Sequence, residues 1–390
     1  MEVWGALKGR AIVEKAMAVG GVGKSGTKRA GRCAKASFAH EALLAWYRAH
    51  RREMPWRGHP SPYAVWVSEI MLQQTQVETV KPYFDRFMAK FPTVRRLAAA
   101  ELESVLALWQ GLGYYTRARN LHRAAQGVAA RPDAALPRTA AELAELPGVG
   151  DYTAAAIASI CFAERVPVVD GNVARVFARH DRLDDDFRAQ PPRRALAKRL
   201  QPAFDATESP GDLNQAMMEL GALVCRPRNP DCAACPLAAD CEARKRGEQA
   251  AYPRRTPKAP PPVRHAVAVL LRRGGRWLLV RREGEGLLGG LWELPGGAME
   301  EGESPMAAAR RLVPARTGVV LGAVEEAREI RHGFSHFTLV LHVLAASAVA
   351  GRGRASRGGP VRWVADADLA ALPVATAHRR ALELGSGVHA

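Results

Sequence analysis

The sequence predicts a multidomain protein in which an all-α domain precedes a smaller α+β domain. From Ser37 to about Leu223, apolar residues recur at spacings of three and four, and strand-like alternation is nearly absent. After a Pro-rich run that ends at Pro262, short alternating segments typical of strands appear instead. The 390 residues, 48% of them hydrophobic, are enough for two or three domains with ordinary cores.

The charge balance indicates a polyanionic partner. The chain has 56 Lys and Arg against 39 Asp and Glu, a formal net charge of +17. This excess favours nucleic acid first and an anionic membrane second, although a GC-rich genome that prefers Arg to Lys would produce the same excess. The longest apolar runs, such as 153–163, fall well short of the ~20 residues that cross a bilayer, and no signal-like segment starts the chain. We therefore expect no membrane partner.

The N-terminal half is assigned element by element from periodicity. Residues 1–36 are rich in Gly, Ala and basic residues without any period, which predicts a disordered basic arm. Pro and Gly then separate one helical segment from the next. The expected helical segments are 39–50, 64–90, 102–108, 117–130, 140–146, 153–162 and 213–223. Residues 37–224 therefore form the predicted all-α domain.

The C-terminal third begins after a cysteine-rich loop, residues 225–241. Residues 242–262 are basic and Pro-rich, which predicts a semi-extended linker. Residues 263–390 then form the predicted α+β domain. Its strands are expected at 267–271, 277–280, 337–343 and 361–364, and its helices at 305–313 and 378–384.

Four of the six cysteines lie in that loop, with the spacing Cys-x6-Cys-x2-Cys-x5-Cys: Cys225, Cys232, Cys235 and Cys241. A secreted disulfide scaffold would contain more cysteines and would scatter them. Four thiolates at this spacing can hold a four-iron cluster or a tetrahedral zinc ion. The spacing alone leaves both metals open.

A glycine-containing turn, Leu-Pro-Gly-Val-Gly, separates two of the predicted helices at residues 146–150. The proline ends the first helix, and the glycines permit a tight turn whose backbone N–H groups point outward at the start of the next helix. Such a turn can bind a phosphate group without a charged side chain. A plain corner between helices is the alternative, but the basic chain favours phosphate. Gly148, Val149 and Gly150 are therefore candidate DNA-binding residues.

Two carboxylates stand out in the all-α domain. Asp170 follows an apolar stretch and precedes Gly171 and a new helix, a place typical of a helix cap. Glu69 is expected in a helix over 65–80, one turn from Gln73, so the two side chains could line one pocket. An amide such as that of Gln73 can donate and accept along a base edge. A solvated surface glutamate is the alternative for Glu69.

Taken together, these residues resemble the helix-hairpin-helix, endonuclease III-like DNA glycosylases that carry a four-iron cluster. Within that superfamily, the chain is most similar to the adenine DNA glycosylases of the MutY type, from about residue 38 to 241. The supporting strings are WVSEIMLQQTQV at 66–77, WQGLGYYTRARN at 109–120, LPGVGDYT at 146–153, VDGNV at 169–173 and NQAMMELGALVC at 214–225. The resemblance implies one 4Fe-4S cluster rather than zinc, held by the four loop cysteines.

The resemblance also implies a reaction. Adenine mispaired with 8-oxoguanine or guanine in double-stranded DNA would be flipped out and removed by hydrolysis of its N-glycosidic bond, by a monofunctional, monomeric enzyme in the bacterial cytoplasm and nucleoid. Glu69 would be the general acid, and Asp170 would stabilise the sugar cation. The remaining roles fall to residues around the sugar (Tyr152, Asn172), around the adenine (Trp56, Arg57, Gln215) and around the opposing oxidised base (Gln74, Thr75, Leu112, Tyr114).

The C-terminal domain resembles the Nudix-like domain of the same family, which recognises 8-oxoguanine. Its fingerprint is the string FSHF at 334–337, in which Ser335 and His336 would read the oxidised base. Of the Nudix hydrolase motif, the chain keeps Gly297, Glu303, Arg311 and Gly318 but replaces the later glutamates with Leu312, Ala315 and Arg316. Hard cations need carboxylates, so we expect this domain to bind and not to hydrolyse pyrophosphates.

Three alternatives remain. A bifunctional glycosylase/lyase acting on oxidised pyrimidines needs a Lys amine for a Schiff base, at the position that Tyr152 occupies. A Nudix nucleotide hydrolase needs the missing carboxylates. A DNA-binding module without activity explains neither the pair Glu69 and Asp170 nor the second domain.

Overall fold

The computed structural model describes residues 38–59, 61–257, 259–283, 286–353 and 359–387. The expected basic arm at 1–36 lies outside these residues. Among the described residues, no helix is both long enough and apolar enough to cross a membrane.

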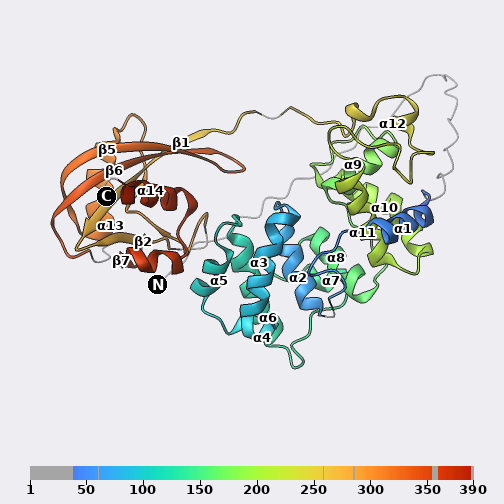
Figure 1. The fold of residues 1–390 in the computed structure, drawn as a ribbon, viewed down its shortest axis with the longest axis horizontal. Coiled ribbons are helices and arrows are strands. Elements are labelled where there is room, and N and C mark those ends of the chain that lie inside the picture. Colours follow the sequence, from blue (N-terminus) through green and yellow to red (C-terminus); the bar gives the residue numbers. More distant parts are fainter. Residues whose placement is uncertain (1–37, 60, 258, 284–285, 354–358, 388–390) are drawn as a thin grey trace, which may run out of the picture. The chain divides into compact units, whose positions relative to one another are not determined.

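The N-terminal domain is helical, as expected, and its described residues form no strand before residue 263. Its helices are α1 (His40–His50), α2 (Pro62–Leu72), α3 (Val77–Lys90), α4 (Val94–Ala98), α5 (Leu102–Trp109), α6 (Thr116–Ala129), α7 (Ala140–Leu143), α8 (Asp151–Phe162), α9 (Gly171–His180), α10 (Gln190–Ala206), α11 (Pro210–Leu223) and α12 (Glu242–Lys245), followed by a 3₁₀ turn, η1 (Gln249–Ala251) (Figure 1).

Two apolar cores organise these helices. One is built by α2–α6 around Trp66, Phe87 and Trp109, and the other by α1 and α9–α11 around Phe177 and Phe204. Helix α8 joins them, since it packs against both α2 and α11. The first chain segment, α1, therefore packs against the last long helix, α11, and residues from α2, α8 and α9 meet where the two cores adjoin.

The structure corrects two expectations here. The single helix expected over 65–80 is wrong: α2 ends at Leu72, Gln74 takes a positive φ of 59°, and α3 starts at Val77. Helix α10 was missed because its first turn contains Pro residues, which are tolerated there since the first N–H groups of a helix have no intrahelical partner.

The C-terminal domain is a mixed sheet covered on both faces. Its elements are β1 (Val263–Arg273), β2 (Arg276–Arg281), β3 (Trp292–Glu293), β4 (Gly296–Ala298), α13 (Pro305–Thr317), β5 (Val320–Gly333), β6 (Thr338–Ala350), β7 (Val361–Ala365), the 3₁₀ turn η2 (Asp366–Ala371) and α14 (Thr376–Gly387). The strand order is β3-β2-β1-β6-β5, with β1 parallel to β6, β4 paired with β1, and β7 with β2.

Alternate residues of β1 face opposite sides of this sheet. Val267 and Val269 pack with α13, while Ala268 and Leu270 pack with α14. The four expected strands and both expected helices are present. Strand β5 was missed because its charged residues alternate with few large apolar ones, although it pairs with β6 in a long hairpin.

Candidate functional site

Glu69 is a buried carboxyl in an apolar helix. Helix α2 is buried at every position from Tyr63 to Met71, and Glu69 is only 5% exposed. The Tyr152 hydroxyl, at the start of α8, donates a hydrogen bond of 3.1 Å to Glu69 Oε2. Burial, helped by the nearby negative charge of Asp170, raises the pKa of Glu69 to about 7, against the lowering effects of Tyr152 and Arg57. The solvated-surface alternative is wrong.

Asp170 is both a helix cap and a neighbour of this carboxyl. Its side chain accepts hydrogen bonds from the Val173 amide (2.7 Å) and from Asn172 Nδ2 (2.8 Å) at the start of α9. Burial raises its pKa, and the hydrogen bonds from Val173 and Asn172 oppose this shift. The helix cap that the sequence indicated for Asp170 is confirmed, and the same carboxylate lies close enough to Glu69 for its charge to raise the pKa of that group.

An arginine that sequence reasoning missed ties this cap to the cysteine loop. Arg175 Nη2 donates to Asn172 Oδ1 (2.9 Å), and Arg175 Nε donates to the Cys225 carbonyl (2.8 Å). Asp170, Asn172, Arg175 and Cys225 thus form a continuous hydrogen-bonded chain. Nothing in the sequence singles out Arg175, because its importance comes only from the approach of residue 225.

The four loop cysteines are all half-buried. Burial, helped by the charges of the other three loop cysteines, raises the pKa of the Cys235 thiol to about 11. The four thiols therefore lie close enough to interact electrostatically. Arg179 Nη1 lies 3.4 Å from Cys225 Sγ, and the same side chain also binds the carbonyls of Arg226 and Pro227. As drawn, the described side chains include no group of three or more His, Cys, Asp or Glu residues placed to hold a metal ion. The donor set itself, four thiols beside a guanidinium, suits an iron–sulfur cluster.

The residues expected around adenine divide in two. Arg57 Nε donates to Gln215 Oε1 (3.0 Å), so this pair comes together. Behind it, buried Glu219 accepts hydrogen bonds from Arg57 Nη2 (3.3 Å) and from Arg52, a contact that the sequence did not indicate. Trp56 is only 6% exposed and packs edge-on against Phe84 in the apolar core.

The residues expected around the opposing base lie on two bent segments held by one buried arginine, Arg117. Its guanidinium donates to the carbonyls of Ile70 and Met71 at the end of α2, and to those of Leu112 and Gly113 before α6. Burial lowers the pKa of Arg117 to about 10. Sequence reasoning missed this residue, which joins segments about forty positions apart.

The geometry of these segments is unusual. Gln74 and Tyr114 both have positive φ angles, 59° and 49°, which non-glycine residues rarely adopt. Tyr114 is 45% exposed, whereas Leu112 is buried beneath it. Thr75 Oγ1 accepts a hydrogen bond of 3.2 Å from Arg117. The two turns with positive φ angles therefore expose the side chains of Gln74 and Tyr114, whereas the side chain of Leu112 is buried.

The turn at 146–150 is built around one glycine. Gly148 has a φ of +79°, and a Cβ there would lie 2.6 Å from Asn120 Cβ, so only glycine fits. Gly150 caps the N-terminus of α8 with an ordinary negative φ, and the Val149 side chain is buried in the core. The turn thus exposes backbone groups, not side chains, to a partner.

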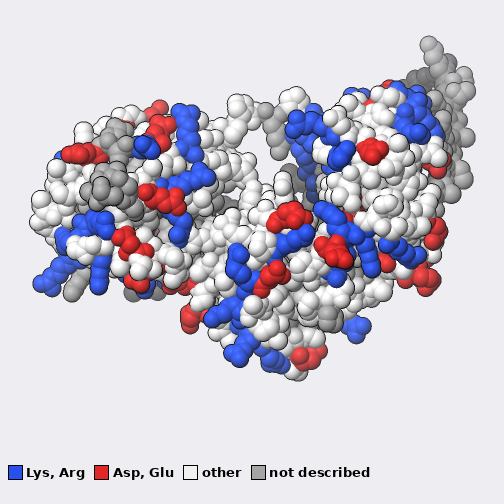
Figure 2. All heavy atoms as spheres, in the orientation of Figure 1, with Lys and Arg blue, Asp and Glu red and all other residues white. Residues whose placement is uncertain are grey.

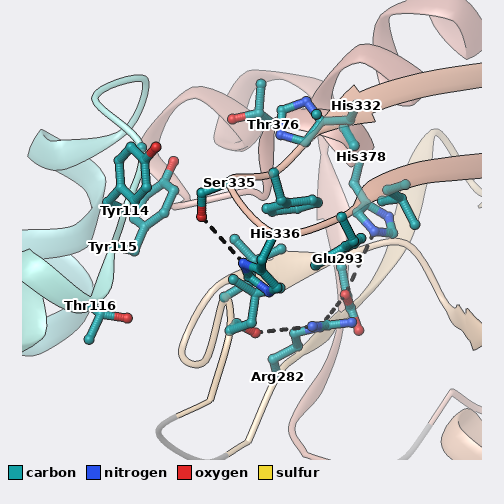
Figure 3. Close-up of a pocket in the computed structure, with 18 of the residues that line it drawn as sticks. Tyr114, Tyr115, Thr116, Arg282, Glu293, His332, Ser335, His336, Thr376 and His378 are labelled. Carbon is teal, nitrogen blue, oxygen red and sulfur yellow. Dashed lines mark hydrogen bonds and ion pairs between the residues drawn. The ribbon is translucent and has the colours of Figure 1, made fainter. Parts of the chain in front are cut away.

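A cavity of about 550 Å³ connects these segments with the C-terminal domain. Its lining includes Gln73, Gln74, Tyr114 and Gly148 of the helical domain and the tip of the β5–β6 hairpin. Figure 3 shows Tyr114 on one side and Ser335 on the other. At that tip, Ser335 Oγ lies 3.3 Å from His336 Nδ1, and both side chains are exposed. Glu69 is not among the residues that line this cavity.

The C-terminal domain lacks the carboxylates of a Nudix hydrolase in space as well as in sequence. Arg311 binds Glu303 at 2.6 Å, and Arg316, at a glutamate position of the motif, donates to Glu293 Oε1 (2.9 Å) and to the Gly296 carbonyl. Leu312 packs 3.5 Å from where a Cβ of Gly297 would lie. Guanidinium and methyl groups therefore occupy the positions of metal ligands.

Basic side chains are spread over the face drawn in Figure 2 and are not gathered in a single patch. On this face, charge alone therefore does not mark one binding surface. The hydrogen-bonded turns and the cavity locate the candidate site more narrowly.

Comparisons with known proteins agree with this arrangement. Residues 67–202 match the family described as HhH-GPD superfamily base excision DNA repair protein, and residues 266–384 match the NUDIX domain. Human adenine DNA glycosylase is 36% identical over 403 residues, which cover 89% of this chain and 73% of that protein. The chain belongs to the adenine DNA glycosylase family.

Other members of the adenine DNA glycosylase family match similarly. The mouse protein is 35% identical, with 88% of this chain and 76% of that protein covered. The Arabidopsis thaliana protein is 41% identical over 304 residues, with 66% and 47% covered. The chain is therefore a DNA glycosylase of base excision repair, and the predicted fold class, a helical glycosylase domain followed by a NUDIX domain, is confirmed.

Proposed function

We propose that the protein removes adenine paired with 8-oxoguanine, or with guanine, from duplex DNA by hydrolysing the N-glycosidic bond. The observation that carries this proposal is the buried Glu69 carboxyl, whose pKa of about 7 lets it hold a proton at neutral pH. Tyr152, which donates to it, occupies the place where a lyase would need a Lys amine. The proposed reaction is therefore monofunctional hydrolysis.

Adenine must leave the base stack before it can reach Glu69, at a cost of a few kcal/mol. The protonated Glu69 then donates its proton to N7 of adenine, which turns a poor leaving group into a good one. The Tyr152 hydroxyl can continue to donate to the carboxylate that remains.

Departure of the base leaves positive charge on the sugar. Asp170 provides the compensating negative charge, and its bonds to the Val173 amide and to Asn172 keep the carboxylate in place. We assign Tyr152 and Asn172 to the surroundings of that sugar.

The other assignments rest on the family resemblance, and the contacts described above support part of them. Arg57 and Gln215, whose side chains are hydrogen-bonded to each other, bind the adenine. Trp56 is the third residue of this adenine-binding set. Gln74, Thr75, Leu112 and Tyr114 form the wedge around the opposite base, and Ser335 and His336 read its oxidised edge across the cavity. The backbone of Gly148, Val149 and Gly150 binds a DNA phosphate.

We assign one 4Fe-4S cluster to Cys225, Cys232, Cys235 and Cys241. Four half-buried thiols, close enough for the other three to raise the pKa of Cys235, support this choice of cofactor, and Arg179 Nη1 lies 3.4 Å from one of them, Cys225 Sγ. When bound, the cluster supplies structural order to the loop at 225–241. We further propose a monomer that acts on DNA in the bacterial cytoplasm and nucleoid, with domain limits at 37–224, 225–241, 242–262 and 263–390.

The test is a cleavage assay on three duplexes, containing adenine opposite 8-oxoguanine, adenine opposite guanine, or an oxidised pyrimidine. We expect base loss only from the first two, with strand breaks appearing only after alkali treatment. Cleavage of the third duplex alone, or strand breaks without alkali, would overturn the proposal.

A further inference from the structure

A short segment of the NUDIX domain, residues 286–292, makes much of its described contact with the helical domain, and we call it the docking loop. Arg119 of α6 reaches it from the helical side. Its Nη1 donates to the Gly289 carbonyl (2.7 Å), and its Nη2 donates to the Gly286 carbonyl (3.0 Å). Arg119 is only 7% exposed. A planar guanidinium can bond two carbonyls at once, so this contact fixes orientation as well as distance.

A second polar contact lies on α5. Glu103 Oε1 accepts a hydrogen bond of 3.0 Å from the indole nitrogen of Trp292, and Glu103 Oε2 lies 3.6 Å from Arg281 Nη1. Trp292 is 2% exposed. One carboxylate of the helical domain therefore holds two groups of the NUDIX domain.

Apolar packing fills the space between these polar contacts. Leu291 and Ala375, both from the NUDIX domain, are fully buried in the core that α2–α6 build. Gly290 has a φ of +80°, and a Cβ there would lie 3.1 Å from Leu106 Cδ1. The docking loop is thus packed tightly against the helical domain.

The docking loop is also tied to the rest of its own domain. Arg282 Nη1 donates to the Leu287 carbonyl (3.1 Å), the Gly290 amide donates to the Arg282 carbonyl (2.9 Å), and Arg282 Nε binds buried Glu293 (2.6 Å). On the helical side, Arg119 lies little more than one turn beyond Tyr114. The contact therefore sets the distance across the cavity between Tyr114 and the hairpin tip at Ser335 (Figure 3).

We propose that Arg119 and Glu103 are specificity-positioning residues, which hold the NUDIX domain docked so that Ser335 and His336 face Gln74 and Tyr114 before DNA binds. This inference rests on the proposed function. Without the contact, a domain tethered by a linker samples many placements, and only a fraction of molecules present the hairpin correctly. The loss affects recognition of the opposite base, and the chemistry at Glu69 is unaffected.

The experiment measures excision by the full-length protein at sub-saturating concentration on adenine opposite 8-oxoguanine and opposite guanine. Arg119→Ala should lower the ratio of the two rates about tenfold, with the rate opposite guanine nearly unchanged. Arg119→Lys keeps the charge but cannot bond both carbonyls, and should lower the ratio similarly, which separates docking from attraction to DNA. Arg96→Ala, an exposed arginine of α4, is the matched control and should keep the wild-type ratio.

Hydrogen exchange provides a second readout. Glu103→Ala is a further test variant, which removes the contact made by α5. Amides of residues 282, 283 and 286–292 should exchange faster in Arg119→Ala and in Glu103→Ala than in the wild type. An unchanged ratio, or equal losses on both duplexes, would overturn the inference, because docking would then serve no discrimination. A wild-type protein that excises adenine from neither duplex would instead overturn the proposed function.

Discussion

At the scale of single residues, burial decides the chemistry of the site. A glutamate in water is ionised at neutral pH and cannot act as an acid there. Glu69 differs because α2 is buried on every side, so desolvation of the carboxylate raises its pKa to about 7. The Asp170 carboxylate is held by two hydrogen bonds from its own helix, one from the Val173 amide and one from Asn172 Nδ2.

The first prediction concerns Glu69→Gln. The amide keeps the shape of the side chain and can still accept the Tyr152 hydrogen bond, but it has no proton to deliver. Single-turnover excision should fall by at least about three orders of magnitude, while duplex binding stays nearly unchanged, because only the transition state loses a contact. Near-normal excision by this variant would rule out Glu69 as the acid. Asp170→Asn should behave similarly and serves as the companion variant.

The second prediction concerns pH. The folded-state pKa of Glu69, about 7, lies above its ordinary value of 4.5, so the folded protein holds the extra proton. The excision rate should fall about tenfold per unit above pH 7, where Glu69 loses its proton, and should also fall at acidic pH, where Asp170, whose pKa is raised by burial, becomes protonated. Folding stability follows the same sign: the folded protein holds a proton that the unfolded chain releases between pH 4.5 and 7, so the wild type loses up to about 3 kcal/mol as pH rises across that window.

Glu69→Gln, which cannot ionise, escapes that loss. Thermal unfolding should therefore show the variant to be more stable than the wild type at pH 8, and the difference should vanish below pH 4.5. If the difference in stability between the wild type and Glu69→Gln were the same at pH 8 and below pH 4.5, that result would contradict a buried, neutral carboxyl.

At the scale of elements, helix ends and turns carry most of the candidate site. Glu69 lies in the helix that stops at Leu72, and Asp170 caps α9. The stop at Leu72 was not predictable from periodicity, since the apolar pattern continues into α3. The end of α2 is held by Arg117 of α6, which donates hydrogen bonds to the carbonyls of Ile70 and Met71.

The third prediction concerns the cysteine loop. Protein purified without oxygen should be brown and contain about four irons per chain, because four grouped thiolates suit such a cluster. Iron analysis and the visible absorption spectrum provide the measurement. A colourless, active protein with one zinc ion per chain would contradict the assignment. Cys161, a half-buried thiol outside the loop, offers Cys161→Ala as a control that should keep the iron.

At the scale of the whole molecule, discrimination needs both domains. Adenine is a normal base, so an enzyme that read adenine alone would damage intact DNA. The hairpin tip at Ser335 and His336 faces Tyr114 across one cavity, so under the proposed function the reader of the opposite base would lie beside the helical domain.

The fourth prediction tests that reader. Replacing Ser335 and His336 with Ala should weaken binding to adenine opposite 8-oxoguanine by roughly 1–3 kcal/mol, the scale of one or two lost hydrogen bonds to a base. Binding to adenine opposite guanine should change much less, and the two duplexes are compared because specificity is a difference of affinities. Equal losses on both would mean that the hairpin touches only the DNA backbone.

The sequence by itself determined the order of the domains, the cysteine spacing, the glycine turn and the residue types at each candidate position. These follow from local rules: periodicity, turn chemistry and the needs of a metal or a phosphate. Only the tertiary structure decided what surrounds each side chain. The burial of Glu69, the bridge from Cys225 through Arg175 to Asn172, and the grip of Arg119 on the docking loop all join segments distant in sequence. Burial and hydrogen-bond partners are set by which elements pack together, and no local pattern encodes them.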